Sequence, residues 1–116
     1  MSGNDPAKCT KPIAFFGSHG QDDQTFNYQT GLGVLNIFVK TNGCTAMTPP
    51  TSGQNAHACV SFEGCTDGYP VRFCNFGSGE NNPHNTSLKG HYPVAKDPGQ
   101  TTSWVPGEAW DFIKQF

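Results

Sequence analysis

The sequence predicts a small, disulfide-stapled α/β fold with two or three strands, one long helix and a C-terminal helix. Three observations predict it. Short apolar runs typical of strands alternate with one stretch of helical periodicity. Five cysteines occur in 116 residues, a dense count. Nine Phe, three Tyr and two Trp argue against disorder, because disordered chains lack bulky apolar side chains.

The N-terminal half predicts one strand followed by one helix. Residues 12–16 (PIAFF) form a short continuous apolar run, which favours a strand buried on both faces. The polar residues 18–24 should then form the loop at the C-terminal end of this strand. Apolar residues recur at helical spacing over residues 28–41, although two glycines weaken the first half. Asn42 and Gly43 tolerate the left-handed conformation that ends helices.

Two further strand-like runs, residues 57–62 and 71–76, flank a connection rich in turn-forming residues. If these runs pair as a hairpin centred near residues 66 and 67, Cys59 faces Cys74. Opposed residues on antiparallel strands lie about 4.5–5.5 Å apart, a separation that a disulfide can bridge. The sequence therefore predicts a disulfide between these two cysteines.

The remaining cysteines leave an odd one. Cys44 would pair with Cys65, and Cys9 would have no partner, although five cysteines with one unpaired allow 15 arrangements in all. A buried free thiol and a partner elsewhere are the two alternatives for Cys9. Because no Cys-x-x-Cys spacing occurs, disulfides in an oxidising compartment are expected rather than a metal site. The sequon at Asn85 is a candidate glycosylation site in a secreted protein.

The C-terminal third predicts a long loop and a short helix. Residues 77–103 show no periodic pattern, and so long a stretch is more often functional or disordered than idle. Residues 106–116 begin with Pro and carry acidic groups early and Lys114 late, as helices do. Trp110 and Ile113 should share the inward face of this helix.

Charge and hydropathy exclude several classes of partner. A net charge of −2 without a basic run predicts no binding of nucleic acid or of an anionic membrane. No apolar stretch approaches the roughly 20 residues of a membrane helix. Residues 1–4 begin no signal peptide, because no apolar region follows. The cysteines indicate secretion all the same, so we expect an upstream segment beyond these 116 residues.

Two polar loops contain the candidate catalytic residues. Residues 19–23 (HGQDD) follow the first predicted strand, and His91 lies in the Gly-His-Tyr-Pro stretch after the last one. Sites in open α/β sheets lie at the carboxyl ends of strands, and a carboxylate there can orient a histidine base. Asp23 precedes His91 by 68 residues, and acid before histidine is the chain order of α/β-hydrolases. His19 and His57 are interpreted as structural or surface residues.

Five motifs in this order resemble those of one enzyme family. They are similar to motifs of the secreted feruloyl esterases and of their acetylxylan-esterase and polyhydroxybutyrate-depolymerase relatives. The likeness spans about residues 3–116. The matching stretches are HGQDD at 19–23, TNGC at 41–44, GC then GYPV with Phe73 at 64–73, GHYP at 90–93, and SWVPGE with Trp110 and Phe112 at 103–112.

The resemblance implies a fold, a reaction and a division of roles. Residues 1–116 would be the C-terminal part of an α/β-hydrolase sheet, without the nucleophile-bearing N-terminal part of the domain. Asp23 would be the triad acid, with Asp22 as the fallback, and His91 the base. The implied substrates are feruloylated or acetylated plant polysaccharides such as xylan, hydrolysed through an acyl-enzyme. The resemblance implies neither a cofactor nor a metal.

The chain departs from the family pattern in two ways. No Ser, Cys or Asp has the Gly-x-Ser-x-Gly setting of a nucleophile elbow, and without a nucleophile no covalent intermediate can form. We therefore expect the isolated chain to be inactive and its partner to be the missing part of the domain. Residues 78–89 look like an insertion before the histidine loop, which makes His84 a fallback base.

Two alternative functions remain open at this stage. A secreted non-catalytic module could bind carbohydrate through aromatic faces, although the apolar neighbours of Trp110 predict that this residue is buried. The candidate binding residues are Trp104, Trp110, Tyr69 and Tyr92. An inactive remnant would expose a sheet edge and an uncovered apolar face, and would therefore be poorly stable.

Overall fold

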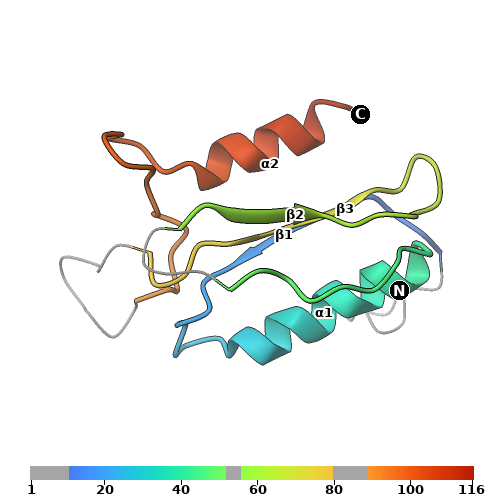
Figure 1. The fold of residues 1–116 in the computed structure, drawn as a ribbon, viewed down its shortest axis with the longest axis horizontal. Coiled ribbons are helices and arrows are strands. Elements are labelled where there is room, and N and C mark those ends of the chain that lie inside the picture. The colour runs from blue at the N-terminus through green and yellow to red at the C-terminus, as the bar shows by residue number, and fades with distance from the viewer. Residues whose placement is uncertain (1–10, 52–55, 80–88) are drawn as a thin grey trace.

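A computed structural model describes residues 11–51, 56–79 and 89–116. It contains β1 (Phe15–His19), α1 (Tyr28–Thr41), β2 (Ala58–Ser61), β3 (Val71–Asn75) and α2 (Val105–Ile113). The strands form one sheet in the order β1-β3-β2, with β1 parallel and β2 antiparallel to β3. The helices lie on opposite faces of this sheet (Figure 1). Neither described helix has the length and apolar character needed to cross a membrane.

β1 lies three residues later in the chain than the sequence predicts, and the expectation of residues 12–16 is corrected here. Pairing with β3 starts where the N–H of Phe15 donates to the carbonyl of Pro70, at 2.9 Å. Ile13 instead exchanges hydrogen bonds of 3.1 and 2.7 Å with the side chain of Asn42. His19, expected in the loop, is therefore the last strand residue. All five residues of β1 are half-buried rather than buried on both faces.

The bounds of α1 agree with the helix predicted over residues 28–41. The Asn27 side chain accepts a backbone N–H of the first turn at 2.7 Å, which caps the otherwise unsatisfied helix start. The helix ends before Gly43, whose φ of +73° suits glycine because no Cβ hinders it. Leu35 and Val39 are buried on the side of α1 that faces the sheet.

The two faces of the sheet form two cores, because successive side chains of a strand point to opposite faces. On the α1 face, the buried residues of the cluster are Leu35, Val39, Phe62, Val71 and Phe73. On the α2 face they are Cys74, Phe76, Ala95, Trp104 and Val105. Each helix thus has its own apolar layer against the central sheet (Figure 1).

Two disulfides join the pairs that the sequence predicts. Cys59 and Cys74 are register partners on β2 and β3, and they are bonded to each other. Cys44 is bonded to Cys65, which connects the end of α1 to the hairpin turn. Cys9 lies outside the described residues. Both disulfides close short loops. A disulfide stabilises the folded state mainly by restricting the unfolded chain.

The orientation of α2 differs from the prediction. Its sheet-facing side contains Phe112, which is 7% exposed, whereas Trp110 and Ile113 are 63% and 57% exposed. The prediction that the latter two face inward is wrong. Glu108, one turn before Phe112, accepts hydrogen bonds of 3.1 and 3.0 Å from the guanidinium of Arg72 on β3. Glu108 thus lies on the flank of α2 next to β3, and Trp110 lies on another side.

Candidate active site

The candidate site lies where β1 and β3 end, because parallel neighbouring strands finish at the same edge of a sheet. Asn75, the last residue of β3, is fully buried and joins the loops at this edge. Its Oδ1 accepts the backbone N–H groups of Gln21 and Gly77 at 3.3 and 2.9 Å. Its Nδ2 donates to Gln21 Oε1 at 2.9 Å and to the carbonyl of Pro50 at 3.1 Å. One amide thus fixes the loop after β1 against the loop after β3.

Two glycines let the backbones of these loops touch. A Cβ on Gly20 would lie against the carbonyl of Gly90 and 2.6 Å from that of Gly77. A Cβ on Gly90, whose φ is +76°, would lie 2.8 Å from the backbone nitrogen of Asp23. Because real side chains do not fit at such distances, both positions need glycine. The residue after Gly90 is therefore held beside the acidic loop.

This contact brings Asp23 and His91 together across 68 residues of sequence. Oδ2 of Asp23 lies 3.3 Å from Nδ1 of His91. The carboxylate is 4% exposed and the imidazole is 28% exposed. Oδ1 of the same carboxylate accepts the backbone N–H groups of Thr25 and Phe26 at 2.8 and 2.9 Å. Both carboxylate oxygens are therefore held, and one of them faces the histidine.

Hydrogen bonding keeps this carboxylate ionised. Burial by itself raises the pKa of Asp23, but the backbone N–H groups of Phe26 and Thr25, together with His91, outweigh it and lower the pKa below its ordinary value. Of the two ring nitrogens of His91, Nδ1 is the one with a hydrogen-bond partner among residues 11–51, 56–79 and 89–116. An ionised acid on Nδ1 is the arrangement in which Nε2 of a histidine can act as a base.

His19 also contacts the acid, which sequence reasoning missed. Its Nε2 lies 3.3 Å from Oδ2 of Asp23 and 2.9 Å from the carbonyl oxygen of Phe26. The available signal was its place in the same five-residue stretch, four residues before the acid. A strand end followed by a tight loop allows such a return contact, but spacing alone does not show which way the ring turns.

The fallback residues have other surroundings. Asp22 accepts a hydrogen bond from the hydroxyl of Ser78, a buried residue after β3. Its backbone N–H donates to the carbonyl of Gly77 at 3.4 Å. These two contacts of Asp22, both within the described part of the chain, do not involve His91. His84 and the sequon residue Asn85 lie outside the described residues.

Comparison with known proteins shows consistent similarity to one group of fungal enzymes. The chain is 29% identical over 109 residues to feruloyl esterase D of Neurospora crassa. It is 30% identical over 104 residues to feruloyl esterase C of Emericella nidulans, and 33% identical over 104 residues to a probable feruloyl esterase C of Aspergillus clavatus. These matches cover 88–90% of the chain.

The chain is related to the feruloyl esterases. The resemblance indicated by its sequence motifs is thereby confirmed. The chain spans about a third of the length of these curated relatives, since each match covers 33% of the relative. No protein-family model matches it.

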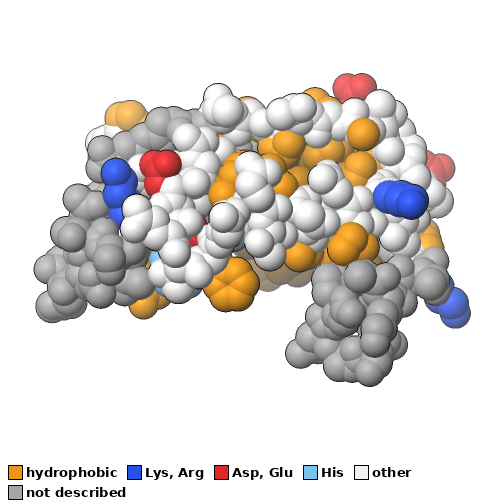
Figure 2. Space-filling model, turned by 90° about the horizontal axis from the view of Figure 1, so that it is seen from below, with side chains coloured by type: hydrophobic (Ala, Val, Ile, Leu, Met, Phe, Trp, Pro, Cys, Tyr) orange, Lys and Arg blue, Asp and Glu red, His pale blue; other side chains and the backbone are white. Residues whose placement is uncertain are grey.

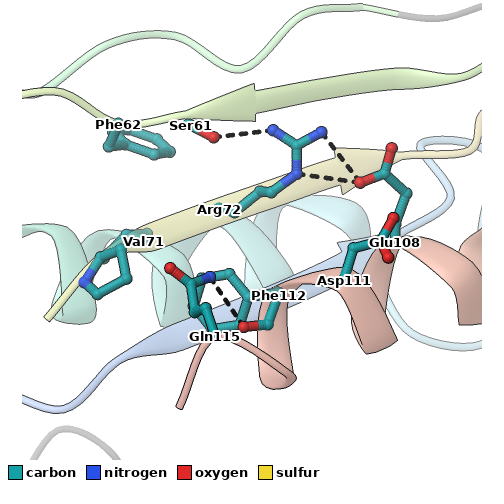
Figure 3. A pocket seen from close by; sticks show the side chains of 9 residues that line it. Ser61, Phe62, Val71, Arg72, Glu108, Asp111, Phe112 and Gln115 are labelled. Carbon is teal, nitrogen blue, oxygen red and sulfur yellow. Dashed lines mark hydrogen bonds and ion pairs between the residues drawn. The ribbon is translucent and has the colours of Figure 1, made fainter. Parts of the chain in front are cut away.

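Two hollows of this feruloyl-esterase relative differ in where they lie: one borders His19 near the acid–histidine pair, and the other lies away from the pair. A groove of about 210 Å³ borders His19 between β1 and α1, lined by apolar side chains that include Phe15, Phe26 and Val34. Apolar side chains reach the surface on this side of the molecule (Figure 2). A hollow of about 460 Å³ lies near the start of β3, beside Arg72 of this strand and Glu108 of α2 (Figure 3). The second hollow contains none of the residues predicted to be catalytic.

One cluster has the ligand types of a metal site but does not fit a metal. Side-chain atoms of His57, Cys59 and Glu108 lie within 4.8 Å of one another. The sulfur of Cys59 is bonded to Cys74, and metals bind the thiolate rather than a disulfide. Both nitrogens of His57 already face carboxylates, Asp97 at 3.1 Å and Glu108 at 2.6 Å. The cluster therefore connects α2 to the residue before β2.

Proposed function

We propose that this chain supplies the acid and the general base of a feruloyl-esterase-like serine carboxylic ester hydrolase. Asp23 is the acid and His91 is the base. The observation that supports this assignment is the 3.3 Å contact between Oδ2 of Asp23 and Nδ1 of His91. It occurs at the carboxyl ends of two parallel strands, the edge at which α/β sheets place their sites.

The chemistry follows from the two nitrogens of the histidine. Nε2 of His91 removes the proton of a serine hydroxyl as the hydroxyl oxygen bonds to the ester carbonyl carbon. The alcohol oxygen then leaves with that proton, and an acyl-enzyme remains. The same nitrogen then deprotonates a water molecule as the water oxygen bonds to the acyl carbon. The bond between this carbon and the serine oxygen breaks, the proton passes from Nε2 to the serine oxygen, and the acid leaves. Asp23 stays ionised and stabilises the imidazolium in both steps.

The serine of this reaction comes from polypeptide other than these 116 residues. No Ser, Cys or Asp of the chain has the nucleophile-elbow setting. The relatives are about three times as long as the aligned segment, which leaves ample length for a nucleophile and its oxyanion donors. Residues 1–116 are on this proposal a partial hydrolase domain, and alone they hydrolyse no ester.

The proposed substrate is a hydroxycinnamoyl ester of a plant cell-wall polysaccharide such as xylan. The names of the relatives, feruloyl esterases D and C, support the feruloyl group, and nothing in the described residues favours an acetyl or a hydroxybutyryl group over it. Secretion is proposed with it, because two disulfides are typical of oxidising compartments.

The deciding experiment is an assay on methyl ferulate with the protein from its natural source, paired with its intact mass. A mass well above 12.5 kDa with activity supports the proposal. In that protein, His91→Ala and Asp23→Ala should lower kcat by at least about a thousandfold. Asp22→Ala and His84→Ala are the matched controls and should change kcat by less than about tenfold.

Two results would contradict the proposal. One is hydrolysis of methyl ferulate by the pure 116-residue chain that disappears in His91→Ala, which would place a nucleophile inside the chain. The other is unchanged kcat in Asp23→Ala of the active protein. A mass near 12.5 kDa without activity would turn attention to a non-catalytic role.

The second candidate is a carbohydrate-binding module, and one observation favours it. Trp110 is 63% exposed, so its indole face is available and the expectation of burial is corrected. Trp104 does not serve, because it is buried and stacks on His57 with ring centroids 3.8 Å apart. Pull-down on arabinoxylan distinguishes the candidates: retention lost in Trp110→Ala, without ester hydrolysis by the full-length natural protein, supports the module.

A further inference from the structure

A second histidine contacts the acid of the proposed triad. Nε2 of His19 and Nδ1 of His91 each lie 3.3 Å from the same oxygen, Oδ2 of Asp23. The His19 side chain is 14% exposed, so water contributes little to this contact. One oxygen of the carboxylate thus lies within 3.3 Å of a ring nitrogen of each imidazole.

The surroundings of His19 fix which nitrogen has the hydrogen. Its Nε2 also lies 2.9 Å from the carbonyl oxygen of Phe26. An ionised carboxylate and a carbonyl can only accept hydrogen bonds, so Nε2 of His19 must be the donor. That hydrogen is donated to the carbonyl of Phe26, and Oδ2 of Asp23 lies 3.3 Å from the same nitrogen. The contact with Asp23 therefore requires no change in the charge of His19.

Packing keeps the His19 ring in this orientation. It meets the ring of Tyr28 edge-on, with centroids 5.5 Å apart and planes at 74°. It also lies against Gly31 of α1, where an added Cβ would be 2.9 Å from Cε1 of His19. Gly31 weakens the helix, and its position under this ring gives a physical reason for a glycine there.

We propose that His19 is a positioning residue, whose Nε2–H is donated to the Phe26 carbonyl and also attracts Oδ2 of Asp23, keeping this oxygen where the Nδ1–H of His91 can reach it. The inference rests on the proposed function. Oδ1 of Asp23 is held by two backbone N–H groups, whereas the described residues that contact Oδ2 are the two histidines. On this proposal, His19 is the group that restrains the direction of Oδ2 while His91 takes up and releases protons.

The test measures the tautomer of His91 in the 116-residue chain by ¹H–¹⁵N NMR near pH 8, where an ordinary histidine is neutral. A histidine bonded to Asp23 through Nδ1 has its hydrogen there, whereas a free one prefers Nε2. His19→Phe keeps a ring against Gly31 and removes the donor. The ratio of the Nδ1–H to the Nε2–H form of His91 should fall about two- to tenfold, the effect of one ordinary hydrogen bond.

The controls separate positioning from general loosening. His19→Gln retains an N–H donor of similar reach and should keep the wild-type ratio. The signals of His57, which lies on the α2 side and pairs with Glu108, should not move in either variant. If His19→Phe lacks the wild-type thermal transition, His19→Asn replaces it, because its amide is too short to reach Asp23.

Each outcome bears on a different statement. A wild-type ratio in folded His19→Phe would overturn the positioning role and leave the Asp23–His91 pair intact. A predominant Nε2–H form of His91 in the wild-type chain would overturn the pair itself, and with it both this inference and the geometric support for the proposed function. A fall in the ratio with rescue by His19→Gln supports the inference without any assay of turnover.

Discussion

The Cα of Gly90 packs directly against the backbone of Asp23, where a Cβ would lie 2.8 Å from the amide nitrogen. This contact is the reason that the residue next to Gly90, His91, reaches an acid from a different loop. It also makes the site depend on the absence of a side chain, so substitutions at Gly90 test the geometry without touching either titratable group.

Gly90→Ala should destabilise the chain by about 2–4 kcal/mol, through a left-handed φ that costs about 1–2 kcal/mol and a clash with backbone that cannot give. The matched control is Gly99→Ala, because Gly99 has a similar φ of +80° but open space around it. Gly99→Ala should lower the free energy of unfolding by only about 1–2 kcal/mol. Denaturant unfolding measures both; equal losses would show that the Gly90 contact is unimportant.

Acid pH should weaken the folded chain through Asp23. Its pKa is lowered from 3.8 in the folded state, so the ionised carboxylate stabilises the fold above its ordinary pKa. That stabilisation is lost as the pH falls through the folded-state pKa. We expect Asp23→Asn to cost about 1–2 kcal/mol at pH 7 and to flatten the loss of stability below about pH 4. Melting temperatures at pH 7, 5 and 3 provide the check.

The control for this titration is Asp67→Asn, because Asp67 lies exposed in the hairpin turn. It should leave the pH dependence of the melting temperature as it is in the wild type. An unchanged acid limb in Asp23→Asn would show that Asp23 is not the group whose protonation unfolds the chain.

The orientation of α2 predicts opposite effects for two neighbouring aromatic residues. Phe112 is 7% exposed and lies 5.8 Å from the ring of Phe16 on β1, so Phe112→Ala should cost about 2–4 kcal/mol. Trp110→Ala removes a largely exposed ring and should stay within about 0.5 kcal/mol of the wild type. Thermal unfolding of both variants distinguishes this orientation from one with Trp110 inside, which would reverse the order.

Glu108 should anchor α2 more firmly than its charge alone suggests. It accepts two hydrogen bonds from Arg72 and faces His57, and the group is mostly shielded from water. Glu108→Gln weakens these charge-assisted bonds and should cost about 0.5–1.5 kcal/mol. Asp111→Asn breaks an exposed pair with Lys114 and should cost about 0.5 kcal/mol or less. Guanidinium melts compare the two, and equal costs would rule out an anchoring role.

Local sequence signals predicted those features that neighbouring residues decide. Helix periodicity and the Asn-Gly stop gave the bounds of α1, because helix hydrogen bonds are local. The hairpin register predicted that Cys59 faces Cys74, because strand pairing repeats every two residues. The order of the HGQDD and GHYP motifs indicated the esterase relationship. These features can be predicted without knowing which residues pack against them.

The tertiary structure decided the rest. β1 starts at Phe15 because its pairing with β3 starts there. A local sequence pattern does not indicate where a parallel partner strand begins. α2 turns Phe112 inward because this ring is buried against Phe16 of β1, and Glu108 meets Arg72 across 36 residues of sequence. The sequence by itself placed two acids and one histidine near one sheet edge. Only the contacts of Gly20, Gly90 and Asn75 show that Asp23, rather than Asp22, meets His91. The direction of a loop side chain depends on backbone that is distant in the sequence.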